Sequence, residues 1–242
     1  MTLGGIMIQK IIHYCWFGGK EKPDLVKKCI KSWKKYCPGY EIKEWNEESF
    51  DLRTAPIYVQ EAYQEKKWAF VTDYVRLWAM YEYGGIYMDT DVEVIKSLDG
   101  FLNDSGFTGF EDDAYMVTGI MAAVKGFPLM KKLLSYYDNR RFIREDGTLD
   151  MTTNTITITQ TLKNIGFLPN GKMQIKDGFA IYPRDYFCPL DDATGKLHKT
   201  ENTVAIHWFN KSWLPEKKRL RNKITRIFHR VFGVNCFKFL KK

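Results

Sequence analysis

The chain has 242 residues, 45% of them hydrophobic and 27% charged, a composition that allows one large domain or two small ones and excludes collagen, coiled coil and disorder. No uninterrupted apolar run reaches the ~20 residues of a membrane-spanning helix, and no secretory signal is recognisable, so we expect a cytoplasmic protein. The formal net charge is +8, yet residues 211–242 hold eleven Lys and Arg and a single acid, and the slightly acidic remainder predicts no nucleic-acid partner.

The first half of the chain alternates strands and helices. A strand over residues 10–17 ends at a Gly-Gly turn, and a helix that begins near Pro23 leads to a second strand over residues 40–45. This order of strand, helix and strand is the βαβ unit of mostly parallel sheets. A long helix over residues 57–83 follows, and a second Gly-Gly pair separates it from a short strand over residues 86–88.

The signals weaken beyond residue 91. We expect strands at residues 107–110, 115–124, 177–187 and 203–208, and helices at residues 129–137 and 155–165, the last with some strand character. The pattern predicts an α/β fold with a Rossmann-like, mostly parallel sheet. A single domain over residues 1–214 would be followed by a helical tail over residues 215–242.

The most informative motif follows the strand over residues 86–88. In the run GGIYMDTD, Asp89 and Asp91 are two carboxylates at i and i+2 that can converge on one side of the chain. Such ligands suit Mg²⁺ or Mn²⁺, which would neutralise the charge of a departing nucleoside diphosphate. The alternative is a solvated turn, but the preceding glycines and aromatic strand favour the metal.

Asp73 and Arg76 lie three residues apart on the helix that precedes this motif, so they share a face. They could form a surface ion pair, which is common and contributes little stability. Because the helix is rich in aromatic residues, we expect it to be buried, and the pair could then hold sugar hydroxyls. The spacing alone favours neither interpretation.

Four further residues could contribute to a site. His207, after a late strand, could complete a mixed carboxylate–histidine metal site or could pack against neighbouring Trp rings. Lys211 and Ser212 could reach phosphate oxygens. Trp16, at the end of the first strand, could stack on a nucleobase or lie in the core.

These segments together resemble glycosyltransferase family 32, the DXD sugar transferases. The family holds capsular-polysaccharide glycosyltransferases and fungal initiating mannosyltransferases, and it is related to the catalytic domain of the large clostridial glucosylating toxins. The resemblance runs from about Ile11 to Trp213. It rests on four segments in the same order: IIHYCWFGG, DYVR, GGIYMDTD and the stretch from Ala205 through Trp213.

The resemblance implies a GT-A fold and retaining transfer of a hexosyl group from a nucleotide-sugar, a UDP-sugar in preference, to a glycan acceptor in capsular or surface-polysaccharide assembly. It implies Mn²⁺ or Mg²⁺ bound by Asp89, Asp91 and His207. The implied catalytic residues are Asp73, Arg76, Asp89 and Asp91. The implied donor-binding residues are Trp16, Tyr87, Asp89, Lys211, Ser212 and Trp213.

The chain departs from the family pattern at two places. The tripeptide Thr153-Asn154-Thr155 stands where many members have Thr-Gly-Pro, and Lys211 stands where a small residue is frequent. Both lie in segments expected near the acceptor or the closing of the site on the donor. The acceptor is therefore not identified by the resemblance.

The tail predicts a basic amphipathic helix over residues 215–232. Six apolar residues from Leu220 to Phe232 fall on one stripe at helical spacing, and Arg and Lys occupy much of the remaining surface. Such a helix could lie on the anionic inner face of the plasma membrane, next to a lipid-linked glycan. It could instead pack on the body and leave its basic face in solvent.

A function of another class stays open, namely a non-catalytic peripheral membrane or glycan-binding protein with a degenerate sugar-nucleotide site. The presence of Asp89, Asp91 and His207 together favours the enzyme, because a decayed site is expected to have lost a ligand.

Overall fold

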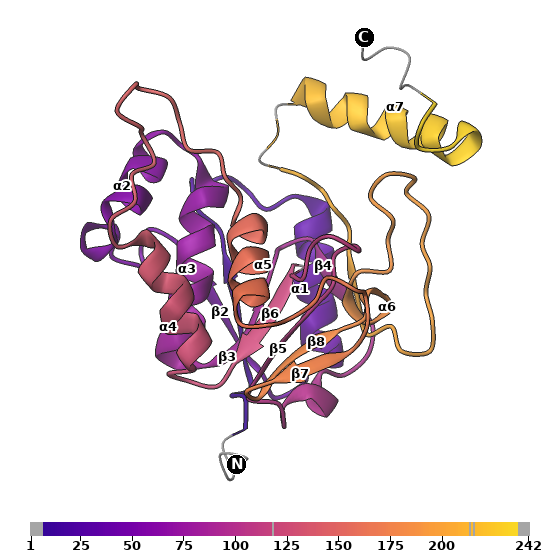
Figure 1. Cartoon of the computed structure of the whole chain (residues 1–242), viewed down its shortest axis with the longest axis horizontal. Helices are drawn as coiled ribbons and strands as arrows, with labels where there is room; N and C mark the ends of the chain where they lie inside the picture. The colour runs from indigo at the N-terminus through magenta and orange to yellow at the C-terminus, as the bar shows by residue number, and fades with distance from the viewer. Residues whose placement is uncertain (1–6, 118, 213, 215, 237–242) are drawn as a thin grey trace.

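A computed structural model of the chain describes residues 7–117, 119–212, 214 and 216–236 (Figure 1). Within them the main sheet has seven strands in the order β2-β1-β3-β6-β5-β8-β7. They are β1 (Ile11–Cys15), β2 (Glu41–Trp45), β3 (Gly85–Met88), β5 (Gly106–Gly109), β6 (Ile120–Ala123), β7 (Gln174–Lys176) and β8 (Phe179–Tyr182). Five strands run in one direction, while β6 and β7 run against them. The sheet is therefore mixed, with the parallel direction in the majority as expected.

Helices cover both faces of this sheet (Figure 1). The α-helices are α1 (Asp24–Tyr36), α2 (Ile57–Gln64), α3 (Trp68–Tyr83), α4 (Pro128–Leu134), α5 (Asn154–Asn164), α6 (Arg184–Phe187) and α7 (Glu216–Phe232). Short 3₁₀ turns lie at Leu52–Thr54, Asp99–Phe101 and Ser135–Tyr137. Helix α3 packs on β1 and β3 and carries α2 and α4, while α1 and α6 contact the second, two-stranded sheet. In the described part of the chain, no helix has the length and apolar character needed to cross a membrane.

The second sheet pairs two segments that are far apart in the sequence. Strand β4 (Val92–Val94) runs antiparallel to β9 (Ala205–His207), with Val92 opposite His207. The sequence predicts β9 but not β4, which directly follows the DXD motif and is too short to show a period of its own. Helix α1 holds β4 in place, since the Trp33 ring N–H donates to the Val92 carbonyl at 2.8 Å.

Three predicted elements are wrong in extent. The strand over residues 177–187 is confined to β8, because the chain passes through Pro183 into helix α6. The helix over residues 57–83 is broken after Gln64, where Lys66 adopts a left-handed φ of 55° and the Lys67 N–H bonds back to the Ala62 carbonyl at 2.8 Å. The break contains neither Gly nor Pro, so the sequence did not signal it. The strand over residues 115–124 is confined to β6, because the Asp112 carboxylate accepts the N–H groups of two following residues and shapes a turn there.

The start of β3 requires glycine because it approaches its neighbours closely. Gly85 has a φ of 104°, and a Cβ there would lie 2.6 Å from the Ile11 carbonyl oxygen on β1. The buried His13 ring fixes the same point, since its Nε2 lies 2.7 Å from the Gly84 carbonyl while its Nδ1 accepts the Trp45 ring N–H. Burial lowers the pKa of His13 to about 4, so the ring is neutral and Nε2 is the donor.

Gly85→Ala should lower the free energy of unfolding by about 2–4 kcal/mol, because a left-handed backbone and a collision with β1 are combined at one residue. Urea denaturation of the purified protein measures this. Gly100→Ala is the matched control, since a Cβ at Gly100 meets no atom within 4 Å. Equal stability of the two variants would contradict the assigned role of Gly85.

Candidate active site

Three potential metal ligands converge at the carboxyl end of β3. One ligand atom each from Asp89, Asp91 and His207 lies within 4.8 Å of the other two. The two acids follow β3 directly, and the β4–β9 pairing places His207 beside Asp91. The structure thus brings together the three residues expected to bind the metal.

The ligand atoms of this group fit a divalent cation. One oxygen of Asp89 accepts from Arg76 and Tyr87 at 2.9 and 3.0 Å. Its other oxygen faces Gly119, where an added Cβ would come within 3.1 Å. Similarly, one oxygen of Asp91 accepts the Asn210 N–H at 2.7 Å, and the other lies 3.4 Å from His207 Nε2. Among the described residues, one oxygen of Asp89 is left for a cation, and the second oxygen of Asp91 faces the His207 ring, whose proton a cation would replace. Carboxylate oxygens suit Mn²⁺ or Mg²⁺.

The electrostatics of the group are those of a site that attracts positive charge. Burial raises the pKa of Asp91, but the adjacent His207 ring and the Asn210 N–H outweigh it, so the net pKa lies below the usual range. Burial opposes protonation of His207, yet Asp91 raises its pKa well above the ordinary value. The proton on His207 thus lies between the ring and Asp91, and a metal ion bound by the same two residues would have to displace it.

Arg76 links the metal group to the helix that precedes it. Its guanidinium donates to Asp89 at 2.9 Å and lies 3.6 Å from Asp73, and it stacks 4.5 Å from the centre of the Tyr87 ring. The side chains of Asp73 and Arg76 are 10% and 12% exposed. The pair is therefore not a surface ion pair, and both residues lie beside the DXD motif.

Asp73 also connects this network to helix α5. Its second oxygen accepts the Asn154 N–H at 3.3 Å, at the first residue of α5. Burial is the main reason that the pKa of Asp73 is raised to about 6, and the neighbouring Arg76 opposes the shift. The sequence does not predict the Asp73–Asn154 contact, because these residues are far apart in the chain and residues 153–155 show only a departure from the family pattern.

Glu111 is a further acid near the metal group. It follows β5, and burial raises its pKa to about 7, while His207 opposes the shift. The sequence alone offered no reason to prefer it to the adjacent Asp112 and Asp113. Only the fold shows that Glu111 is a half-buried acid with a raised pKa close to the metal ligands.

Trp16 borders an open cleft at the carboxyl end of β1. It is half-buried and its ring N–H donates to the Lys20 carbonyl at 2.6 Å. The cleft has a volume of about 580 Å³, and Gly18, Asn46 and Trp68 are among its lining residues. Gly18 is needed here because a Cβ would lie 2.7 Å from the Trp68 ring. Trp16 thus lies at an accessible edge and not in the core.

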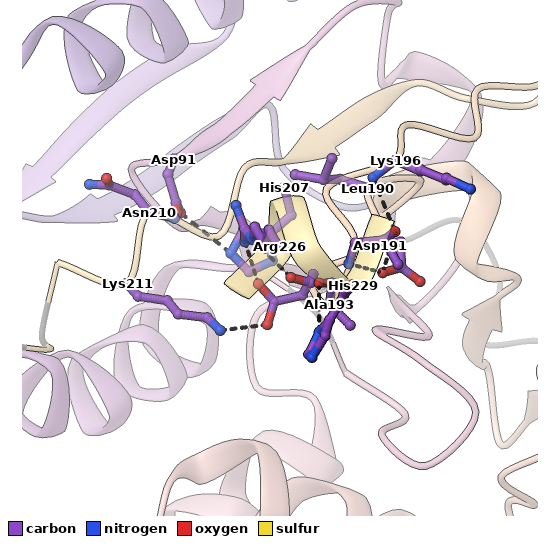
Figure 2. A network of polar contacts seen from close by, with 12 residues as sticks. Asp91, Leu190, Asp191, Ala193, Lys196, His207, Asn210, Lys211, Arg226 and His229 are labelled. Atoms are coloured by element: carbon purple, nitrogen blue, oxygen red, sulfur yellow. Dashed lines mark hydrogen bonds and ion pairs between the residues drawn. The ribbon is translucent and has the colours of Figure 1, made fainter. Parts of the chain in front are cut away.

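The segment after β9 makes two contacts near the metal group: a backbone hydrogen bond to Asp91, and an ion pair of Lys211 that the sequence did not predict. Asn210 donates its N–H to Asp91 (Figure 2). The Lys211 ammonium instead pairs with Asp192, in the loop before β9. Ser212 is exposed in a turn. Trp213, expected to bind the donor, lies outside the described residues.

Residues 23–108 match the family model for the glycosyltransferase sugar-binding region containing the DXD motif. The protein is a glycosyltransferase. The match includes the linked Asp73, Arg76 and DXD residues, and it confirms the family resemblance expected from the sequence. His207, Trp16 and the segment after β9 lie outside the matched region.

This glycosyltransferase has relatives that are similar in sequence or in structure. It is 25% identical over 227 residues to an uncharacterized glycosyltransferase of Acanthamoeba polyphaga mimivirus, covering 88% of this chain and 86% of that protein. It is 29% identical over 130 residues to inositol phosphoceramide mannosyltransferase 3 of Schizosaccharomyces pombe, covering 52% of this chain and 36% of that protein. The solved PaToxG glycosyltransferase shares its fold, with a TM-score of 0.51 and 19% identity over 66% of this chain and 70% of that one.

Asp91→Asn should lower turnover by about 10²–10³-fold, because it removes one anionic ligand of the metal group. The fold should persist, since the amide oxygen can still accept the Asn210 N–H. Turnover of a nucleotide-sugar and the melting temperature measure the two effects. Asp113→Asn, at an exposed acid, is the control; near-normal turnover of Asp91→Asn would remove the metal assignment.

Asp73→Asn should raise the stability of the fold while lowering activity. The folded-state pKa of about 6 exceeds the unfolded value of 3.8, so folding favours protonated Asp73 and stability is lost as the pH rises through this window. The variant should therefore be more stable than the wild type by about 1–3 kcal/mol at pH 8 and similar to it at pH 4. Urea denaturation at both pH values tests this. An equal stability difference between variant and wild type at pH 4 and at pH 8 would contradict the raised pKa of Asp73.

Proposed function

We propose that this glycosyltransferase is metal-dependent and transfers a hexosyl group, with retention at the anomeric carbon, from a nucleotide-sugar to a glycan acceptor in bacterial capsular or surface-polysaccharide assembly. The observation that carries the proposal is the buried link from Asp73 through Arg76 to Asp89, which joins a polar pair to the candidate metal ligands. A UDP-sugar is the preferred donor. Residues 1–214 form the catalytic domain in this proposal, and residues 215–242 form a tail.

Asp89, Asp91 and His207 would hold Mn²⁺ or Mg²⁺, in keeping with ligand atoms that lie within 4.8 Å of one another. When bound, the cation supplies charge neutralisation for the departing nucleoside diphosphate. The protein's own residues hold the ligand atoms before the donor arrives: Asn210 orients Asp91, and Tyr87 orients Asp89. Such preorganisation avoids the cost of rearranging dipoles during the reaction.

Asp73 and Arg76 would orient the donor sugar. Arg76 is held between two carboxylates and over the Tyr87 ring, so its position varies little. A sugar held against this pair presents one face of its anomeric carbon to the acceptor hydroxyl, which is what a defined stereochemical outcome requires. Arg76 also lowers the cost of a charged Asp73 in this buried region.

The remaining donor-binding assignments concern the base and the diphosphate. Trp16 would stack on the base from the edge of the open cleft. Ser212, Trp213 and Lys211 would close over the diphosphate, and Lys211 would exchange its present partner Asp192 for phosphate oxygens. An exposed Ser212 and a half-buried Lys211 are in keeping with a segment that contacts the donor.

The acceptor side of the proposal draws on the relatives and on the tail. One relative is named as an inositol phosphoceramide mannosyltransferase, which supports transfer of a hexose and an acceptor that is attached to a lipid. We place the enzyme in the cytoplasm, at the inner face of the plasma membrane. The tail would meet the anionic surface there, and a lipid-linked glycan would be presented at the same surface.

A panel of UDP- and GDP-sugars, tested with Mn²⁺ and again with EDTA, examines the proposal. We expect thermal stabilisation by one nucleotide only when metal is present, together with slow hydrolysis of one of its sugars. Each donor is compared with its free nucleoside diphosphate, which separates recognition of the sugar from recognition of the diphosphate. Failure of every nucleotide to bind in the presence of metal would favour the non-catalytic binding protein instead.

A further inference from the structure

Helix α7 rests on the body through its polar face. Its half-buried residues recur at the spacing of one helical face, and they are Arg219, Asn222, Thr225, Arg226 and His229. Arg219, Asn222 and Arg226 line a small cavity of about 250 Å³ together with Leu25 and the segment after β9. The helix is therefore in contact with the catalytic body and is not a free extension.

Asp192 is the anchor of this contact. The Arg226 guanidinium donates to the Asp192 carbonyl at 2.8 Å and pairs with its carboxylate, whose other oxygen pairs with Lys211. One turn further along the helix, His229 Nδ1 lies 3.3 Å from the Ala193 carbonyl. The loop that carries these acceptors is closed by Asp191, whose carboxylate accepts both the N–H and the hydroxyl of Thr194.

The opposite face of α7 is apolar and points away from the body. Its side chains are between 42% and 68% exposed, and they are Leu220, Ile224, Ile227, Phe228, Val231 and Phe232. A helix on the surface of a soluble protein usually buries its apolar stripe and leaves its polar face in water. In α7 this orientation is reversed.

Basic residues border the apolar face along both edges. At 100° per residue, Arg221 and Lys218 fall along one edge of the stripe, and Lys223 and Arg230 fall along the other; all four are exposed. A second copy of this helix would bring like charges together at each edge. An anionic surface would instead meet a basic border around an apolar strip, which is the pattern of helices that lie in the lipid interface.

We infer that the apolar face of α7 binds the surface of an anionic lipid bilayer while the helix remains docked on the catalytic body. The inference rests on the proposed function in one respect, because the bilayer would be the one that presents the acceptor. Asn210, which orients the metal-ligand candidate Asp91, immediately precedes the Asp192-bound Lys211. Through Arg226, Asp192 thus holds α7 on the body beside the segment that follows β9.

Flotation of the full chain with lipid vesicles tests the surface. We expect binding to phosphatidylcholine vesicles that contain about one-third phosphatidylglycerol, little binding to pure phosphatidylcholine, and weaker binding in high salt. The triple variant Ile224→Ser/Ile227→Ser/Val231→Ser should lower the partition coefficient by about tenfold or more. The matched control is Ile156→Ser/Leu168→Ser/Ile175→Ser, at residues of similar exposure on the body, which should bind as the wild type does.

Two results would overturn the surface assignment. One is equal binding by the two triple variants. The other is a wild-type dimer that the α7 variant converts to a monomer, without vesicle binding, which would identify a second copy of the chain as the occupant. Circular dichroism and melting of the α7 variant show whether the rest of the protein is intact, and donor hydrolysis without vesicles tests the proposed function separately.

A cross-link tests whether the helix binds while docked. In a Cys236→Ser background, Ala193→Cys and His229→Cys would be joined by a short bis-maleimide, since the other four native cysteines are buried. The locked protein should bind anionic vesicles within about twofold of the unlocked protein. Loss of binding on locking would overturn the docked orientation and would show that α7 must leave the body to reach the lipid.

Discussion

The placement of the Arg76 guanidinium between the buried Asp73 and the half-buried Asp89 underlies the architecture of this active site. A buried charge without a partner would cost several kcal/mol of solvation, and Arg76 supplies that partner to Asp73 while it donates to Asp89. The same guanidinium packs on the Tyr87 ring, so α3 and β3 are joined by charge and by an aromatic contact. Through Asp73 the link continues to the first residue of α5.

The second constraint is the pairing of β4 with β9, which brings residues more than one hundred positions apart to one point. A two-stranded sheet is marginal by itself, and here α1 supports it. Trp33 donates to the Val92 carbonyl, and Ser32 accepts the Val94 N–H at 3.0 Å. The consequence is chemical as well as structural, since Val92 opposite His207 sets the imidazole beside Asp91.

The sequence predicted those elements whose boundaries are marked by neighbouring residues, and it missed features that depend on segments far apart in the chain. Strands β1, β2 and β3 and helix α1 were expected within a few residues of their observed ends, because turn residues bracket apolar runs there. The turn at Lys66 was missed because a left-handed lysine has no signature in sequence. The anchor residue Asp192 was missed for a similar reason, since its partners Lys211 and Arg226 lie in segments that meet only after folding.

The sequence by itself determined which chemical groups are available and which of them share a face. It placed two carboxylates after a short strand, an acid and a base one turn apart on a helix, and an apolar stripe along α7. Only the tertiary structure decided that Asp73 and Arg76 are buried, that His207 stands beside Asp91, and that α7 turns its apolar face outward. The periodicity of one segment specifies which residues share a face of a helix. Which face is then buried depends on the contacts that other segments of the chain offer to each face.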